Sequence, residues 1–165
     1  MNAYKYIKQS LRANLKSKMI GWRKSDSIVK LEKPSDIGKA RMLGYKDKKG
    51  FVMVRVRLVR GGRKKKMIRH NRRSARNTIR KDIVISYKEV AEIRAGNRFR
   101  NLEVLNSYEL GKDGMYYFIE VILVDPQRPE IQNDRTINFV CNPKNRKRVL
   151  RGLTSSGQKS RGLRN

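Results

Sequence analysis

The chain has 165 residues, which is enough for one domain of ordinary size but not for two. It has 42 Lys and Arg residues against 14 Asp and Glu residues, a formal net charge of +28. A solvated monomer gains nothing from such self-repulsion, so the composition predicts a polyanionic partner. The single cysteine, Cys141, excludes an intrachain disulfide and a cysteine-based metal cluster, and it predicts a reducing compartment.

The N-terminus and the hydropathy pattern give no sign of a membrane. Residues 1–18 lack the unbroken apolar core of a secretory signal, and no stretch approaches the roughly 18 apolar residues of a membrane span. We therefore expect a soluble intracellular chain. Residues 101–134 have a net charge of −5 and the other 131 residues a net charge of +33. This division predicts that the acidic part faces water or protein and that the rest faces phosphate.

The first predicted element is a basic amphipathic helix over residues 2–20. Its apolar residues recur every three or four positions, with Lys and Arg between them and no acidic residue before Asp26. The basic side chains could simply solvate the outer face. The missing acidic partners favour a helix that lies against an anionic surface instead. The residues predicted to bind there are Tyr4, Lys5, Lys8 and Arg12.

Two short elements follow this helix. Residues 27–33 predict a strand, which Pro34 ends. Ser35 and Asp36 can then cap a short helix that stops at Gly44.

Residues 51–60 predict a longer strand, in which apolar residues alternate with Arg55 and Arg57. These arginines either blunt an exposed strand or face something negative. The strand leads into residues 60–81, and between positions 55 and 81 there are thirteen Lys or Arg residues and no acidic one. Such a segment cannot fold alone, so we predict a loop ordered by a polyanion, against the alternative of a solubilising or nuclear-import tract. The residues of this loop predicted to bind the polyanion are Arg60, Arg63, Lys64, Lys65, Lys66, Arg69, His70, Arg72, Arg73, Arg76, Arg80 and Lys81.

Residues 83–99 mix two signals, and we interpret them as a helix packed over a sheet, with Asp82 near its start. Residues 101–127 then predict a β-hairpin that turns at Asp113 and Gly114. In its first strand one face is expected to hold the alternating apolar residues Leu102, Val104, Tyr108 and Leu110.

The second strand of the hairpin, residues 115–124, is apolar on both faces. It should therefore lie in the middle of a sheet with helices over at least one face. Its one acidic residue, Glu120, is expected to contact an arginine of the neighbouring strand, because an unpaired buried charge is costly. Residues 129–134 predict a single helical turn.

Residues 135–165 hold nine basic residues, no acidic residue and no regular periodicity. We predict an extended tail whose glycines allow close approach to a crowded surface. A disordered basic tail is the plainer alternative. The residues of this tail predicted to bind the polyanion are Arg146, Lys147, Arg148, Arg151, Lys159 and Arg161.

No catalytic or metal-binding constellation can be assembled from the sequence. His70 is the only histidine and has no nucleophile or carboxylate at a suggestive spacing. Glu120 and Asp125 are five residues apart on one strand, so they project to opposite faces. We therefore predict no catalytic residues, no metal, no cofactor and no small-molecule substrate.

Four stretches resemble, in the same order, the large-subunit ribosomal protein fifteen of archaea and eukaryotes, the e-type family. They are YKYI at residues 4–7, KPSDIGKARMLGYKDKKGFVMVRVRLVRGGR at 33–63, NLEVLNSYELGKDGMYYFIEVILVDP at 101–126 and RGLTSSGQKSRGL at 151–163. The resemblance implies a small α+β domain with an antiparallel sheet, and basic extensions threaded into large-subunit ribosomal RNA. It also implies an architectural role in cytoplasmic large subunits, beside neighbouring ribosomal proteins and without catalysis.

The combined prediction is an α+β fold, a small antiparallel β-sheet with helices packed on it. To this it adds a basic N-terminal helix (1–25), a globular domain (26–134) with a basic loop (60–81), and an extended C-terminal tail (135–165). Two other classes stay open. A DNA-packaging protein uses the same charge but would bind duplex DNA as well as structured RNA. An RNA-processing enzyme would need clustered carboxylates or a histidine pair, which the sequence lacks.

Overall fold

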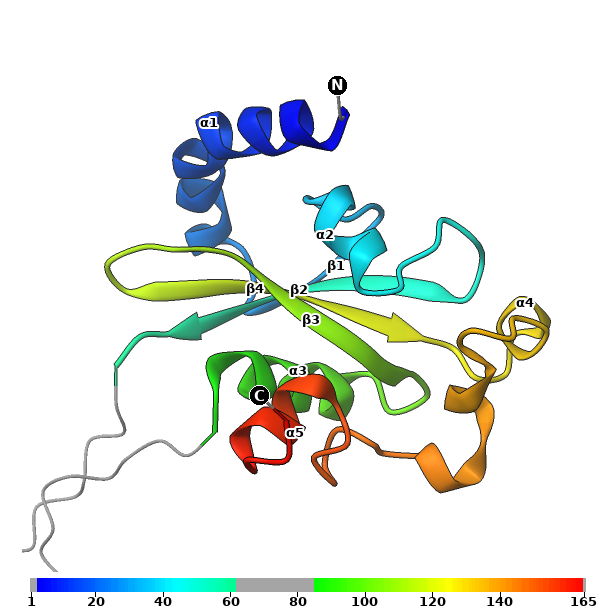
Figure 1. The fold of residues 1–165 in the computed structure, drawn as a ribbon. Coiled ribbons are helices and arrows are strands. Elements are labelled where there is room, and N and C mark those ends of the chain that lie inside the picture. Colours follow the sequence, from blue (N-terminus) through cyan, green and yellow to red (C-terminus); the bar gives the residue numbers. More distant parts are fainter. Residues whose placement is uncertain (1–2, 62–84, 165) are drawn as a thin grey trace, which may run out of the picture.

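Residues 3–61 and 85–164 are described in a computed structural model of the chain (Figure 1). Their centre is a four-stranded antiparallel sheet in the order β1-β2-β4-β3. Helices pack on this sheet, which confirms the predicted α+β class. The strands are β1 (Ile28–Leu31), β2 (Phe51–Val59), β3 (Glu103–Lys112) and β4 (Tyr116–Val124).

Strand β4 is a central strand, as its two apolar faces predicted. It pairs with β2 on one side and with β3 on the other. Ile119 and Val121 belong to the core cluster on one face, whereas Phe118 and Ile122 belong to the cluster on the opposite face. All four side chains are at most 1% exposed, so β4 joins two cores.

The predicted common face of the first hairpin strand is wrong. The register of β3 against β4 shifts between Val104 and Asn106, which marks a β-bulge or similar irregularity. An extra residue in one strand reverses the side-chain alternation beyond it. Val104 therefore packs with Leu102 in one core, whereas Tyr108 and Leu110 lie in the other.

One face of the sheet is covered by α3 (Tyr87–Arg98), which buries Ala91 and Ala95. The helix begins later than residue 83, because Ser86 has an extended backbone and its hydroxyl caps the N–H of Glu89. The sequence offered Asp82 as a start, but that residue lies outside the described ranges. The helix also runs past Gly96, where an added Cβ would lie 3.0 Å from Val149.

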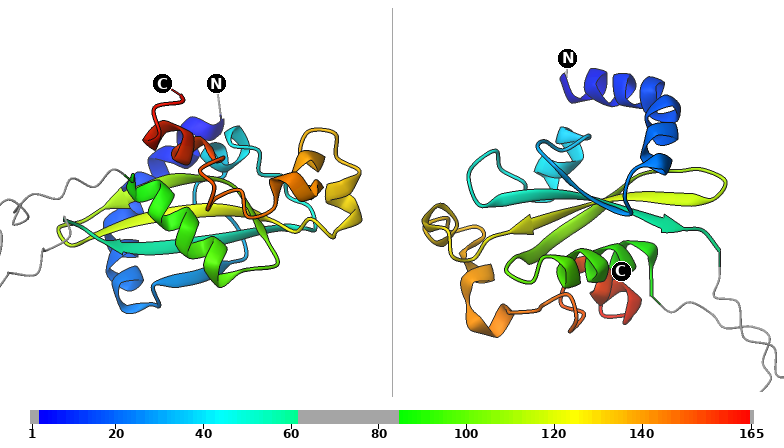
Figure 2. Two further views of the ribbon diagram at one scale, coloured as in Figure 1. Left: turned by 90° about the horizontal axis from the view of Figure 1, so that it is seen from below. Right: turned by 180° about the vertical axis from the view of Figure 1, so that it is seen from behind.

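The opposite face is covered by α1 (Ala3–Lys24) and α2 (Ile37–Met42). Leu11 and Met19 of α1 are buried, and Asp36 caps α2 by accepting the N–H of Lys39. Figure 1 and Figure 2 show α1 running over α2 at its N-terminal end and descending to the sheet at its C-terminal end. No helix within the described part of the chain is long and apolar enough to cross a bilayer.

The C-terminal segment differs from the extended tail that the sequence predicted. It follows α4 (Pro129–Gln132) and contains η2 (Asn138–Cys141), η3 (Pro143–Asn145) and α5 (Ser155–Ser160). Ile137, Val140 and Val149 are at most 4% exposed and complete the cores. These three residues are spaced to meet the surface of the domain and do not share one helix or strand. The sequence therefore had no periodicity that could have predicted their burial.

Candidate nucleic-acid interface

The basic helix α1 is anchored to the sheet by two arginines of β2. The guanidinium of Arg55 lies 4.6 Å from the centre of the Trp22 ring and donates to the Ser25 hydroxyl at 3.4 Å. Arg57 donates to the Arg23 carbonyl and lies 4.8 Å from the centre of the Tyr116 ring. Arg55 and Arg57 thus lie half-buried beneath α1, and neither lies on a free outer face.

The C-terminal end of α1 is also paired with the hairpin turn. Arg23 Nε lies 3.0 Å from Asp113 Oδ2. The other oxygen of Asp113 accepts the N–H groups of Met115 and Tyr116, at 2.8 and 2.6 Å. These contacts orient α1 and leave its remaining cations to the solvent.

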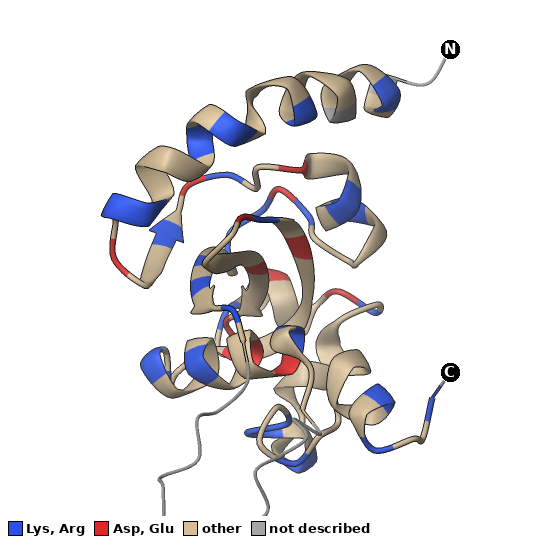
Figure 3. Cartoon of the chain, turned by 90° about the vertical axis from the view of Figure 1, so that its left-hand side faces the viewer, with Lys and Arg blue, Asp and Glu red and all other residues tan. Residues whose placement is uncertain are grey.

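Cations of α1 that do not contact the sheet are exposed. They include Lys5 and Arg12, which were predicted to bind. They also include Lys16 and Lys18, which were not among the predicted contacts. The Tyr4 hydroxyl accepts a hydrogen bond from Arg41 of α2 at 2.9 Å. Lys8 belongs to the same helix, but its side chain lies outside the described part. Figure 3 shows the cations distributed along α1.

The basic loop leaves and re-enters the domain at one place. The Tyr87 hydroxyl accepts the N–H of Gly61 at 3.0 Å, and the Tyr87 ring stacks on Tyr117 with 4.3 Å between centroids. Arg60 lies over the Tyr117 ring at 5.5 Å. The other predicted loop contacts lie outside the described residues: Arg63, Lys64, Lys65, Lys66, Arg69, His70, Arg72, Arg73, Arg76, Arg80 and Lys81.

Arg148 was predicted to contact RNA, but its donors bind the domain itself. Its guanidinium donates to the carbonyls of Val104, Leu105 and Leu153 at 2.7, 3.0 and 3.2 Å. Burial lowers its pKa, and the nearby Glu92 and Glu103 carboxylates act in the opposite direction. Arg148 therefore clamps the C-terminal segment onto β3.

The other predicted cations of the C-terminal segment are exposed. Arg151 donates to the carbonyls of Lys144 and Arg146, and Arg161 donates to the Arg151 carbonyl at 2.9 Å. These bonds within the segment shape it, while the side chains stay at the surface. The exposed members are Arg146, Lys147, Arg151, Lys159 and Arg161.

The structure adds a group of cations that sequence reasoning missed. Lys88, Arg94, Arg98 and Arg100 are exposed on α3 or directly after it. Arg94 and Arg98 are four residues apart, so they lie on one side of the helix, next to the face that buries Ala91 and Ala95. The hydrophobic period of this helix was recognised, and its polar face could have been assigned from the same period.

Most acidic side chains of the described ranges are buried or half-buried, but within residues 101–134 only Glu103 and Glu120 are buried. That this acidic part faces water or protein stays a prediction. Five acidic side chains are buried, and within the described ranges only Asp26, Glu32 and Asp47 fall in the exposed class. Figure 3 shows cations on the outer helices. The buried acids are Asp36, Glu89, Glu92, Glu103 and Glu120.

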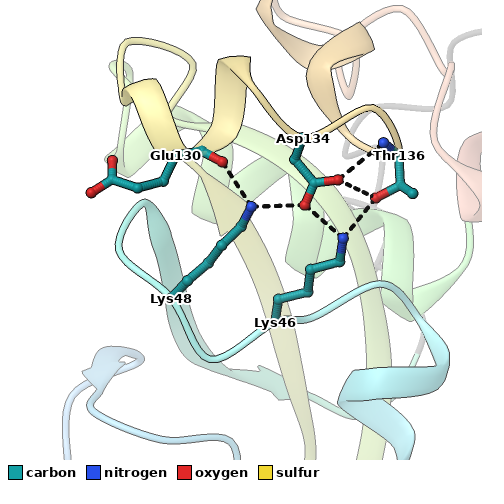
Figure 4. Close-up of polar contacts among 5 residues, drawn as sticks. All are labelled: Lys46, Lys48, Glu130, Asp134 and Thr136. Atoms are coloured by element: carbon teal, nitrogen blue, oxygen red, sulfur yellow. Dashed lines mark hydrogen bonds and ion pairs between the residues drawn. The ribbon is translucent and has the colours of Figure 1, made fainter.

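Asp134 illustrates how an acid is neutralised near the surface (Figure 4). Its Oδ2 accepts hydrogen bonds from Lys46 Nζ at 2.6 Å and Lys48 Nζ at 2.7 Å. Thr136 donates to its Oδ1 from both its hydroxyl and its N–H. The two lysines, with Thr136, lower the pKa of Asp134 well below its ordinary range. The loop before β2 is thereby fastened to the start of the C-terminal segment.

Glu120 lies opposite Arg55 in the register of β4 and β2, so an arginine of the neighbouring strand is near it, as expected, but the two side chains form no ion pair. Its hydrogen bonds, however, come from Ser35 and Tyr108. Ser35 donates from its N–H at 3.1 Å and from its hydroxyl at 2.6 Å, and the Tyr108 hydroxyl donates as well. Burial raises the pKa of Glu120, although these donors and Arg55 oppose the shift.

No group of three His, Cys, Asp or Glu side chains within residues 3–61 and 85–164 is arranged to hold a metal ion. The described surface instead combines outward cations with internally paired acids. This combination is typical of a protein that contacts a polyanion over a wide area.

Comparison with known proteins identifies the family. A family model described as Ribosomal L15, of the e type, matches residues 2–165. The chain is also 51% identical over 152 residues to the large ribosomal subunit protein eL15 of Thermoplasma volcanium, which covers 90% of this chain and 76% of that protein. The chain belongs to the e-type ribosomal protein L15 family. Members of this family are structural, non-enzymatic components of the large ribosomal subunit.

Proposed function

We propose that this protein stabilises folded large-subunit ribosomal RNA through the cations of α1, of the loop at residues 60–81 and of the C-terminal segment. The observation that supports this most is the sorting of charge. Within the described ranges all acids except Asp26, Glu32 and Asp47 are buried or half-buried, whereas most cations of α1, α3 and the C-terminal segment are exposed. The protein is then part of cytoplasmic ribosomes and lies beside other ribosomal proteins.

The proposed mechanism is electrostatic and geometric. Side chains of Lys and Arg neutralise phosphates where RNA helices converge, and each such contact releases counterions. Because the deep groove of A-form RNA hides its bases, contacts to the backbone and to shape dominate. Affinity should therefore fall steeply with salt and depend on the folded RNA.

We assign different tasks to the three parts of the chain. Residues 1–25 lie as a basic helix along RNA, and residues 26–134 form the domain that carries the basic loop at 60–81. Residues 135–165 follow the domain surface, and their cations other than Arg148 face the RNA. The anchors of α1 on Arg55 and Arg57 support this division, because they fix the direction in which the helix leaves the sheet.

The proposal is tested by sedimenting a cell lysate through sucrose after a wash in roughly 0.5 M salt, where screening extends only a few ångströms. We expect the protein to remain with the large subunit. Release into nucleoid or soluble fractions would contradict an integral role and favour generic binding to nucleic acid.

A second test separates loop contacts from general charge. Replacing Arg63, Lys64, Lys65 and Lys66 by Ala should reduce the slope of log affinity against log salt by about three to four, since each lost phosphate contact removes about 0.7 to 0.9 units. The melting temperature of the free protein should hardly change. A matched control neutralises Lys30, Lys33, Lys49 and Arg128, exposed cations that lie outside α1, the loop and residues 135–165. Equal slopes for the two variants would refute the loop contacts.

A further inference from the structure

Two adjoining cavities lie between the end of α3, the start of β3 and the C-terminal segment. The first has a volume of about 260 Å³ and the second about 250 Å³, and both are lined by Arg100 and Glu103. Neither is occupied by a side chain of the described chain. The first has an apolar floor, whereas polar groups of residues 141–143 contribute to the second.

The apolar floor of the first cavity consists of Leu102, Val149 and Leu150. Val149 is buried in the core, but Leu150 beside it is 53% exposed. An exposed leucine is unremarkable alone. Here it borders a hollow whose floor continues into the core, so a flat apolar ligand could cover it and remove its surface from water.

Cations surround this floor. Arg100 and Lys147 line the first cavity, Arg146 lines the second, and all three are exposed. The one acidic lining residue, Glu103, is buried, and its carboxylate accepts the N–H of Lys147 at 2.9 Å. Asn97 adds an exposed amide at the edge.

This arrangement suits a nucleotide better than an apolar side chain of a protein. The base of a nucleotide has a flat face that can pack on the leucines and polar edges that an amide can recognise, and the phosphate of the nucleotide can bind the cations. Drug-sized ligands occupy cavities of roughly 300–1,000 Å³. A cavity of about 260 Å³ fits a smaller group such as one planar base.

We propose that the first cavity receives one unpaired base of large-subunit ribosomal RNA, turned out of its helix. Its face packs on Leu102 and Leu150, Asn97 binds its edge, and Arg100 and Lys147 bind the adjoining phosphates. This proposal rests on the proposed function and adds a defined recognition site to contacts that otherwise involve the RNA backbone.

The test uses the full chain and transcribed large-subunit RNA. Leu150→Gln is neutral, so it removes apolar packing without changing charge, and we expect affinity to fall by about threefold to tenfold with an unchanged salt slope. Arg100→Gln should lower the slope by about one. Leu163→Gln is the matched control, because Leu163 is 67% exposed in the same segment and does not line the cavity.

Identical affinities for Leu150→Gln and Leu163→Gln would overturn the base site and leave the proposed function intact. Absence of salt-dependent RNA binding by the unaltered chain would refute both. Placing a diazirine-bearing leucine analogue at position 150 in assembled large subunits identifies the occupant directly. A crosslink to a single RNA site supports the proposal. A crosslink to a neighbouring protein, or none above that of the analogue at position 163, overturns it.

Discussion

The two faces of the sheet are built in different ways. Under α3 the core consists mainly of aliphatic side chains. The buried Glu92 beside them accepts hydrogen bonds from the hydroxyls of Ser107 and Ser156 at 2.5 Å each. Under α1 and α2 the face includes the charged residues Arg55 and Glu120 beside aromatic rings.

This difference separates two tasks. The aliphatic face supplies folding free energy through apolar burial, which does not depend on charge. The polar face positions α1, the helix proposed to lie on RNA, through contacts that depend on the protonation and integrity of single side chains. The comparison predicts that damage to the first face unfolds the domain and that damage to the second mainly releases α1.

The largest effect should follow from placing a charge in the aliphatic core. Ile119 is 1% exposed, so Ile119→Asp buries an unpaired carboxylate and should lower the free energy of unfolding by about 3 kcal/mol or more. Denaturant unfolding followed by circular dichroism measures this loss. Met115→Asp is the control, because Met115 is 59% exposed at the turn beside the same strand. A similar loss in both variants would contradict the assignment of the core.

A smaller loss is expected where the C-terminal segment joins this face. Ser156→Ala removes one of the two hydroxyls bound to the buried Glu92, and should cost about 1–3 kcal/mol. Hydrogen exchange of α5 should increase more than that of β4, because the lost bond connects α5 to α3. Ser155→Ala serves as the control, since the Ser155 hydroxyl accepts a hydrogen bond from the exposed Arg164 at 3.2 Å. Equal protection in the two variants would show that the bond to Glu92 is unimportant.

On the polar face, Arg55→Met should loosen α1 without unfolding the sheet. The substitution removes the cation over Trp22, a loss of about 1 kcal/mol, and leaves Glu120 without the opposing charge. Trp22 is the only tryptophan in the chain, so its fluorescence reports the position of α1 directly. We expect a red shift with nearly unchanged circular dichroism of the sheet. Arg12→Met, on the exposed side of α1, should leave the fluorescence as it is.

Acid titration should distinguish two carboxylates of opposite behaviour. Burial raises the pKa of Glu120, so the folded state holds this proton more tightly than the unfolded state. The resulting stability is complete below the ordinary glutamate pKa of about 4.3, and is lost as pH rises through the raised value. Glu120→Gln should therefore flatten the fall of stability above about pH 4. An unchanged pH profile would contradict a buried, titrating Glu120.

The smallest effect concerns Asp134, whose pKa is lowered by Lys46 and Lys48. Its contribution is present above the ordinary aspartate pKa of about 3.9 and is lost as pH falls further. Asp134→Asn should remove part of the acid sensitivity and leave stability at neutral pH nearly unchanged, because the contact is at the surface. Thermal melts between about pH 2 and 5 measure this, with Asp26→Asn as an exposed control. If Asp134→Asn and Asp26→Asn show the same dependence of melting temperature on pH, the contacts of Asp134 with the two lysines do not contribute to acid sensitivity.

The sequence by itself determined the elements whose evidence is local. The alternation of β2, the two apolar faces of β4, the Asp113–Gly114 turn and the Asp36 cap all depend on neighbours within a few residues. The central position of β4 followed as well, because a strand that is apolar on both sides must be covered on both sides.

Only the tertiary structure decided which long-range partners each polar group finds. Ser35 binds Glu120 from 85 residues away, and Arg148 binds carbonyls of β3 from 43 and 44 residues away. Neither pairing has a periodicity that a local pattern could reveal. Local patterns also could not predict the path of the C-terminal segment, because the surface that it covers determines its shape. Nor could they predict the irregularity in β3, where one extra residue changes the side of the sheet to which the following side chains point. The composition shows that the chain is rich in cations and predicts a polyanionic partner, but only the fold determines which of these cations are exposed and could bind that partner.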